Sequence, residues 1–282
     1  MNLRKALDRA RKEREQQICL DDVSPGTISR PEVSAPGWQP PVYSESKKVT
    51  INIKTAIQNH CIALAESFEE NNYYKVLRTQ LRQLSKRKKW NTIMVTSTSA
   101  NEGKTVTSIN LAATFAREHN QTVLLVDADL RMQMIHRYLG YHRRLGLLDY
   151  LQRNADMRDI ITWPGIEKLT IISGERVIDD SSELISSPRM QSLMKDLKNR
   201  YDDRFVIFDA PPILGVADTL AFAPLVDCIV IVVGAGITSR NDLKEAIEFL
   251  PQDKIAGFIL NRHKNPNKLY GRYGYRYGRK VA

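Results

Sequence analysis

The chain has 282 residues and a formal net charge of +10 at pH 7. This length suffices for one sizeable α/β domain with appendages, and the composition is ordinary for a soluble globular protein. The longest apolar run, around 229–233, is far shorter than the roughly 20 residues that cross a membrane, and residues 1–7 lack the apolar core of a secretory signal. Cys19, Cys61 and Cys228 lack metal-ligand spacing, so we expect reduced thiols in a cytoplasmic protein.

The positive charge is concentrated in the flanks of the chain. Residues 49–90 and residues 266–282 each carry a net charge of +5, whereas residues 91–265 carry −2. Basic flanks indicate an acidic partner, such as lipid headgroups, an acidic protein or nucleic acid, or they are solvated tails. We therefore look for the chemistry in the near-neutral part.

Two segments precede the predicted core. Residues 1–20 form a basic amphipathic pattern with Leu3, Leu7 and Ala10 on one face, which predicts a helix that lies on a membrane or partner, or a weakly ordered terminus. Residues 21–49 contain five prolines and several serines, which is typical of a linker.

Residues 50–265 have the pattern of a domain. Residues 50–88 are predicted to be helical in two pieces, the second from Phe68 to Leu84, followed by four basic residues (86–89) that suit a helix C-terminus. From Trp90, apolar runs alternate with helical stretches, at Thr92–Val95, Val123–Val126, Leu169–Ile172, Phe205–Phe208, Ile229–Val233 and Gly257–Leu260. This alternation predicts an α/β fold with a mainly parallel sheet covered by helices on both faces.

A polar loop follows the first of these strands and closes on Gly103-Lys104-Thr105 before a helical pattern. Such a loop presents backbone N–H groups and a helix N-terminus to a phosphate, while the lysine reaches the outer phosphates and the threonine hydroxyl binds magnesium. Thr98 occupies the usual first-glycine position. The predicted nucleotide-binding residues are Ser99, Ala100, Asn101, Glu102, Gly103, Lys104, Thr105 and Val106.

Aspartates stand at the ends of two later strands. Asp127 and Asp129 follow one strand and Asp209 ends another, so they can face the phosphate-binding loop at the carboxyl edge of the sheet. Mg²⁺ prefers few carboxylates together with water and phosphate oxygens. Asp218 is a weaker candidate, and Arg131 either forms an ion pair or touches phosphate. His136 and His142 belong to no cluster and are expected to be surface or packing residues.

These motifs together resemble the Walker A, A′ and B motifs of the bacterial protein-tyrosine kinases, P-loop proteins of the deviant-Walker type. The matching residues lie at 103–105, 127–131 and 209–212, and a tyrosine-rich C-terminus is a further mark of that family. The resemblance covers about 50–282, and the start of the chain looks like the stand-alone autokinases of exopolysaccharide gene clusters.

The resemblance implies a non-specific protein-tyrosine kinase with ATP and Mg²⁺. Lys104 would act on the phosphates, with Thr105, Asp129 and Asp209 around the metal. Asp127 would be the base for the tyrosine hydroxyl, although Asp127 and Asp129 could exchange roles. Asn261 resembles the adenine-reading position. The flexible tail (266–282) would supply the phosphate acceptors, Tyr270, Tyr273, Tyr275 and Tyr277.

The same resemblance implies partners and a location. They are a second copy phosphorylated in trans, a membrane polysaccharide co-polymerase or chain-length determinant protein, and a cognate tyrosine phosphatase, at the inner face of the cell membrane. Nucleic acid is not expected, although a tail rich in arginine and tyrosine could bind RNA by stacking.

Three positions depart from the family pattern, and two other functions remain open. Asn72 and Lys75 replace the Glu and Arg of the helix motif that ends at Arg78, Met132-Gln133 replaces Arg-Pro, and Ser181-Ser182 replaces Asn-Pro. One alternative is a switch ATPase of the partition and division type. Such ATPases carry an extra lysine in the loop, at the position that Ser99 occupies in this chain. The other is a non-catalytic ATP-binding scaffold, against which the intact Lys104 and aspartates argue.

Overall fold

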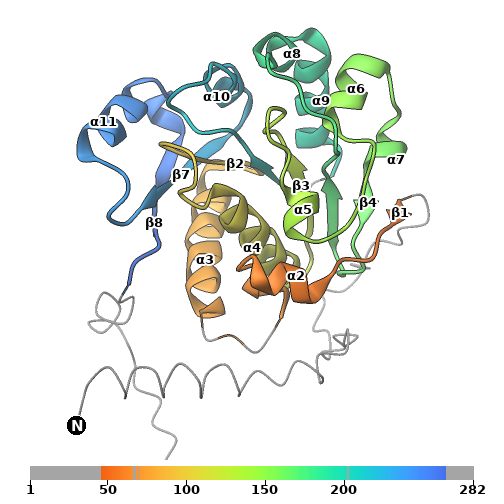
Figure 1. Ribbon diagram of the computed structural model, residues 1–282, viewed down its shortest axis with the longest axis horizontal. Helices are drawn as coiled ribbons and strands as arrows, with labels where there is room; N and C mark the ends of the chain where they lie inside the picture. The colour runs from red at the N-terminus through yellow and green to blue at the C-terminus, as the bar shows by residue number, and fades with distance from the viewer. Residues whose placement is uncertain (1–45, 66–67, 69, 202, 265–282) are drawn as a thin grey trace, which may run out of the picture. The chain divides into compact units, whose positions relative to one another are not determined.

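The computed structural model describes residues 46–65, 68, 70–201 and 203–264 (Figure 1). The expectations for the N-terminal helix, for most of the linker and for the tail with its four tyrosines lie outside the described residues. None of the described helices is sufficiently long and apolar to span a bilayer.

The described residues form an eight-stranded sheet with the order β1-β4-β5-β3-β6-β2-β7-β8. Neighbouring strands are parallel except β4 and β5, which are antiparallel. The strands are β1 (Lys47–Lys48), β2 (Thr92–Ser97), β3 (Thr122–Asp127), β4 (Thr162–Trp163), β5 (Leu169–Ile172), β6 (Arg204–Asp209), β7 (Cys228–Gly234) and β8 (Ile255–Asn261). All six strands predicted from apolar runs are confirmed, and the mainly parallel α/β fold is confirmed with them.

Helices cover both faces of the sheet (Figure 1). One face packs against α2 (Ile53–Gln58), the 3-10 turn η2 (Ile62–Leu64), α3 (Asn71–Lys88), α4 (Lys104–Ala116) and α5 (Ile135–Tyr138). The other face packs against α6 (Leu147–Arg153), α7 (Met157–Ile160), α8 (Ser182–Ser186), α9 (Pro188–Asn199), α10 (Asp218–Phe222), η3 (Ala223–Leu225) and α11 (Arg240–Glu248), and η4 (Gln252–Lys254) precedes β8. The helix predicted over Phe68–Leu84 is α3, and it ends in the basic run as expected, with Lys89 as a left-handed C-cap.

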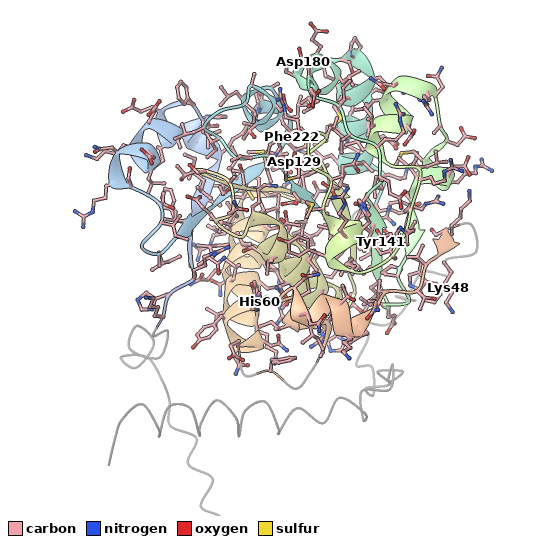
Figure 2. The ribbon with its side chains drawn as sticks, viewed as in Figure 1. Lys48, His60, Asp129, Tyr141, Asp180 and Phe222 are labelled. Carbon is pink, nitrogen blue, oxygen red and sulfur yellow. The ribbon has the colours of Figure 1, made fainter. Side chains whose placement is uncertain are left out.

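Two apolar cores follow from the alternation of side chains along the central strands. In β3, Leu124 and Val126 face one core, while Val123 and Leu125 face the other. All six residues of β2 and of β3 are buried, which is why their sequences read as continuous rather than alternating apolar runs. Figure 2 shows Phe222 inside the domain and Lys48 at its periphery.

Candidate active site

The loop between β2 and α4 places the start of a helix at the carboxyl edge of the sheet. Gly103 caps α4 with φ of +98°, a conformation that side chains rarely adopt. A Cβ atom on Gly103 would lie 2.1 Å from Nδ2 of Asn261, at the end of β8. The backbone conformation therefore favours glycine at this position, and a side chain here would also displace the Asn261 amide. The N–H groups of the first turn of α4 are oriented to bind an anion.

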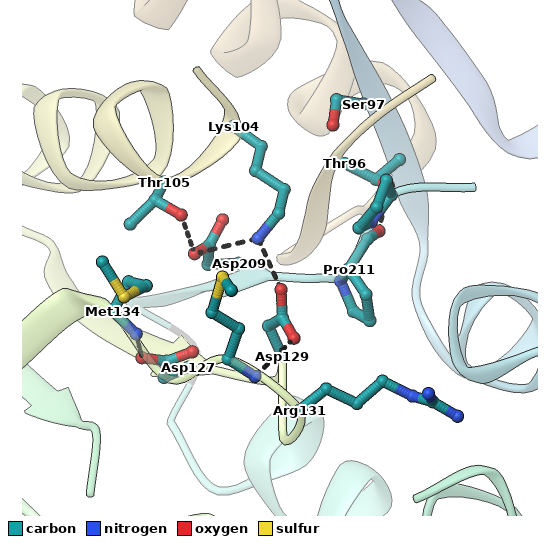
Figure 3. A network of polar contacts seen from close by, with 12 residues as sticks. Thr96, Ser97, Lys104, Thr105, Asp127, Asp129, Arg131, Met134, Asp209 and Pro211 are labelled. Carbon is teal, nitrogen blue, oxygen red and sulfur yellow. Dashed lines mark hydrogen bonds and ion pairs between the residues drawn. The ribbon is translucent and has the colours of Figure 1, made fainter. Parts of the chain in front are cut away.

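Lys104, the first residue of α4, lies among carboxylates (Figure 3). Its Nζ donates a hydrogen bond of 2.8 Å to Oδ2 of Asp129 and lies 3.7 Å from Oδ2 of Asp209. Burial alone would lower the pKa of Lys104, but Asp209 and Asp129 outweigh it, and the pKa lies above its usual value. The ammonium group therefore stays charged at neutral pH, next to the helix N-terminus.

Asp209, the last residue of β6, is held from α4. The Thr105 hydroxyl donates to its Oδ2 at 2.6 Å, and the Ser108 hydroxyl lies 3.1 Å from its Oδ1. Burial raises the pKa of Asp209, although Lys104 and Thr105 act in the opposite direction. The hydroxyl and the carboxylate expected to hold magnesium are thus in direct contact.

Asp127, the last residue of β3, is fully buried and held from one side only. Its Oδ2 accepts the N–H groups of Met134 and Ile135 at 3.0 Å each, and the Ser173 hydroxyl at 2.9 Å. Its Oδ1 has no hydrogen-bond partner among the described residues. Burial, together with the charge of Asp209, raises the pKa of Asp127 well above its usual value. A raised pKa and a free oxygen suit a group that accepts a proton.

Asp129 completes the group from the loop after β3. Its Oδ1 accepts the N–H of Met132 at 3.0 Å, while Oδ2 holds Lys104. The described residues contain no cluster of three acidic, histidine or cysteine side chains that could hold a metal ion by itself. Mg²⁺ does not require such a cluster, because it is usually held by one or two carboxylates together with substrate phosphates and water.

Arg131 and Asp218, left open by the sequence, form an ion pair. Nε of Arg131 donates to Oδ2 of Asp218 at 3.1 Å, and the Ser181 hydroxyl donates to the same oxygen. Asp218 is fully buried at the start of α10. The ion pair ties the loop after β3 to α10, and the hydrogen bond from Ser181 ties Asp218 to the residue before α8.

Comparisons with known proteins agree with this geometry. Residues 90–254 match the family described as AAA domain. The tyrosine-protein kinase YwqD of Bacillus subtilis is 32% identical over 79% of this chain and 94% of its own length. The chain belongs to the bacterial tyrosine-protein kinase family. The kinase domain of Escherichia coli tyrosine kinase ETK superposes with a TM-score of 0.62 at 27% identity, covering 74% of this chain and 80% of that one. The septum site-determining protein MinD of Pyrococcus horikoshii shares the fold, with a TM-score of 0.50 at 24% identity over 62% of this chain and 71% of that one.

At two of the positions where this chain departs from the family pattern, the residue present forms hydrogen bonds with its neighbours. Gln133 is buried, accepts the N–H of Gly174 at 2.7 Å and donates to the carbonyl of Arg176, and Ser181 contacts Asp218 as described. In the third, on α3, Arg78 pairs with Glu118 while Asn72 and Lys75 are exposed. None of these substitutions replaces Lys104, Thr105 or one of the three strand-end aspartates.

Several polar residues that contact the site residues were not predicted from the sequence. Ser108 lies one turn after Lys104, so helical spacing alone could have placed it near the same carboxylate. Ser173 follows β5, and its contact with Asp127 depends on β5 lying beside β3. Thr238, which contacts Glu102, gives no local signal at all. His136 is buried, with Nδ1 3.2 Å from the Ser173 hydroxyl, and His142 is exposed.

Proposed function

We propose that this protein is an ATP-dependent protein-tyrosine autokinase that transfers the γ-phosphate of ATP to its own C-terminal tyrosines. The observation that carries the proposal is the contact of Lys104 with Asp129 and of Thr105 with Asp209 at the N-terminus of α4. Family membership supports tyrosine as the acceptor.

Each group would have a role that is consistent with its position. Lys104 would leave Asp129 for the outer phosphates of ATP, because both are anions and the lysine side chain is flexible. Asp127 would accept the proton of the tyrosine hydroxyl on its free Oδ1, since its raised pKa makes it the stronger base. Asp127 and Asp129 could exchange these roles. Catalysis would depend on positioning and charge neutralisation, as is usual for phosphoryl transfer.

The residues that would hold Mg²⁺ are Thr105, Asp209 and Asp129. When bound, Mg²⁺ would neutralise charge on the phosphates. These residues suit Mg²⁺ chemically, because the Thr105 hydroxyl and an Asp209 carboxylate oxygen lie in direct contact and both are oxygen ligands. Ser99–Val106 would bind the phosphates, and Asn261, which donates from Nδ2 to the Glu102 carbonyl at 2.8 Å, would contact the adenine.

The acceptors in this proposal are Tyr270, Tyr273, Tyr275 and Tyr277, modified by a second copy of the chain. The protein would work at the inner face of the cell membrane, regulate exopolysaccharide biosynthesis with a membrane co-polymerase, and be reset by a tyrosine phosphatase. The basic flanks support a location beside anionic lipid.

The test is incubation of the full chain with Mg-ATP, followed by mass spectrometry of the C-terminal peptides. We expect phosphotyrosine in the wild type and a loss of about 100-fold or more in rate for Lys104→Met, because a charge that stabilises the transferring phosphate is removed. Lys168→Met, which removes another buried lysine, is the matched control and should retain the activity. Absence of tail phosphate in the wild type would contradict the proposal.

A switch ATPase is the second candidate, favoured by the fold that this chain shares with MinD. Ser99, where those ATPases carry a loop lysine, argues against it. ATP turnover without phosphotyrosine would favour the switch ATPase, and ATP binding with neither turnover nor phosphotyrosine would favour a scaffold.

A further inference from the structure

Glu102, inside the phosphate-binding loop, is a fully buried carboxylate. Among the described residues it forms no ion pair, and its Oε2 has no hydrogen-bond partner. A polar oxygen that is buried without a hydrogen-bond partner is costly, so we ask what the Glu102 side chain does. Its Oε1 accepts one hydrogen bond, from the hydroxyl of Thr238.

Thr238 lies in the loop between β7 and α11, and its hydroxyl is used in both directions. It accepts the N–H of Gly234, the last residue of β7, at 2.9 Å, and it donates to Glu102. A Cβ atom on Gly234 would lie 3.5 Å from Cγ of Glu102, so the Glu102 side chain lies close to the Gly234 backbone. The phosphate-binding loop is thereby tied to the loop that follows β7.

Asn261 is fixed to the same two segments. Its Nδ2 donates to the carbonyl of Glu102, and its own carbonyl accepts the N–H of Ala235 at 2.9 Å. Residues of three strand ends therefore meet on Glu102: its side chain holds the β7 end through Thr238, and its backbone holds the β8 end through Asn261. Because β2, β7 and β8 are neighbours in the sheet, this edge forms one continuous surface.

We propose that Glu102 and Thr238 are positioning residues that hold the base side of the nucleotide site, including Asn261, against the phosphate-binding loop. In this role the Glu102 and Thr238 side chains act on each other, while the loop would bind the phosphates through its backbone N–H groups. This inference rests on the proposed function, because Asn261 is taken as the adenine contact. It makes Thr238 a determinant of affinity for the nucleoside part of ATP and not for its phosphates.

The experiment compares two ligands on the full chain by calorimetry, Mg-ATP and Mg-tripolyphosphate. Thr238→Val keeps the β-branched shape but removes the hydroxyl, and we expect Kd for Mg-ATP to rise about tenfold, the size of one hydrogen bond to a charged group. Kd for tripolyphosphate should change by less than about twofold. Thr238→Ser, which retains the hydroxyl, should restore tight ATP binding, and kcat at saturating ATP should stay near that of the wild type.

Other outcomes overturn the inference. An unchanged Kd for ATP in Thr238→Val would do so, and so would an equal loss for both ligands, since the contact would then support the phosphate loop. Glu102→Gln keeps an oxygen for Thr238 and should bind ATP nearly as the wild type does, whereas Glu102→Leu should behave as Thr238→Val. ATP binding without tail phosphorylation would count against the kinase proposal alone, because these measurements need no phosphoryl transfer.

Discussion

Buried carboxylates at strand ends define this site at the scale of single residues. Asp127 and Asp209 are the last residues of the neighbouring parallel strands β3 and β6, and they lie opposite each other in the register of the two strands. Each is fully buried, and burial raises the pKa of both. The effect of burial on the pKa of Asp209 is opposed by Lys104 and Thr105. Asp127 accepts hydrogen bonds only from backbone N–H groups and a hydroxyl, all on one oxygen. Ionisation of Asp127 should therefore lower the stability of the ligand-free protein.

Asp127→Asn should gain stability relative to the wild type as the pH rises. An unfolded aspartate ionises near pH 3.9, whereas folded Asp127 keeps its proton to higher pH because its pKa is raised. Between those two pKa values the folded state binds more protons than the unfolded state, so the wild type loses stability with rising pH. Asparagine cannot ionise and escapes this loss. Urea denaturation from pH 4 to pH 8 measures the difference.

Asp159→Asn is the control, with the opposite sign. The hydrogen bond and charge of Lys47 lower the pKa of Asp159, so its ionised form contributes stability that is present above about pH 4 and is lost below. Its difference from the wild type should stay constant between pH 5 and pH 8. A constant difference for Asp127→Asn over the whole range would show that its burial carries no such penalty.

The roles of single residues were predictable where a sequence motif identified them. They were not predictable where the role depends on a contact between segments that are distant in the sequence. The loop motif identified Lys104 and Thr105, and strand-end position identified the aspartates, because the carboxyl ends of parallel strands share one edge. Ser173 and Thr238 were not predictable, since each acts through a residue that is distant in sequence and close only after the sheet has formed.

At the scale of elements, burial decided what the sequence could show. The central strands are buried on both faces, so their continuous apolar runs were recognisable. Strand β1, at one edge of the sheet, and its neighbour β4 have two residues each and no apolar run, and their pairing depends on contacts with distant segments. Helix α3 gave a clear period and a basic end, but the orientation of its arginines needed the structure.

The ion pairs between α3 and Glu118, just after the end of α4, give the prediction at this scale. Arg78 and Arg82 both contact Glu118, and Arg78 also donates to the carbonyl of Thr114 at 3.1 Å. Glu118→Ala leaves two arginines without their carboxylate, Arg78 being the more buried. We expect the free energy of unfolding to fall by about 1–3 kcal/mol.

A matched exposed pair controls for loss of charge alone. Arg200 and Asp196 form an ion pair on α9 that is largely in solvent. Asp196→Ala should cost no more than about 0.5 kcal/mol, because exposed pairs of this spacing contribute little. Chemical denaturation of both variants gives the comparison. An equal decrease in the free energy of unfolding would mean that the ion pairs of Glu118 contribute no more than an exposed pair.

At the scale of the whole molecule, the charge of the chain is divided between its parts. Residues 91–265 carry a net charge of −2, while the segment 266–282 carries +5. If copies of the chain present this segment to one another, attraction between unlike charges favours association. Each phosphotyrosine adds about −1.5 to −2 at pH 7, so phosphates on four tyrosines would reverse the sign of the segment.

Autophosphorylation should therefore weaken association between copies. Light scattering before and after incubation with Mg-ATP should show a lower mass afterwards, and raising the salt should lower the mass of the unphosphorylated protein in the same direction, because ions screen such charges beyond about 8 Å at 0.15 M. Lys104→Met treated identically should keep its mass, as should a variant with phenylalanine at the four tail positions. An unchanged mass in fully phosphorylated wild type would show that the charge of this segment does not govern assembly.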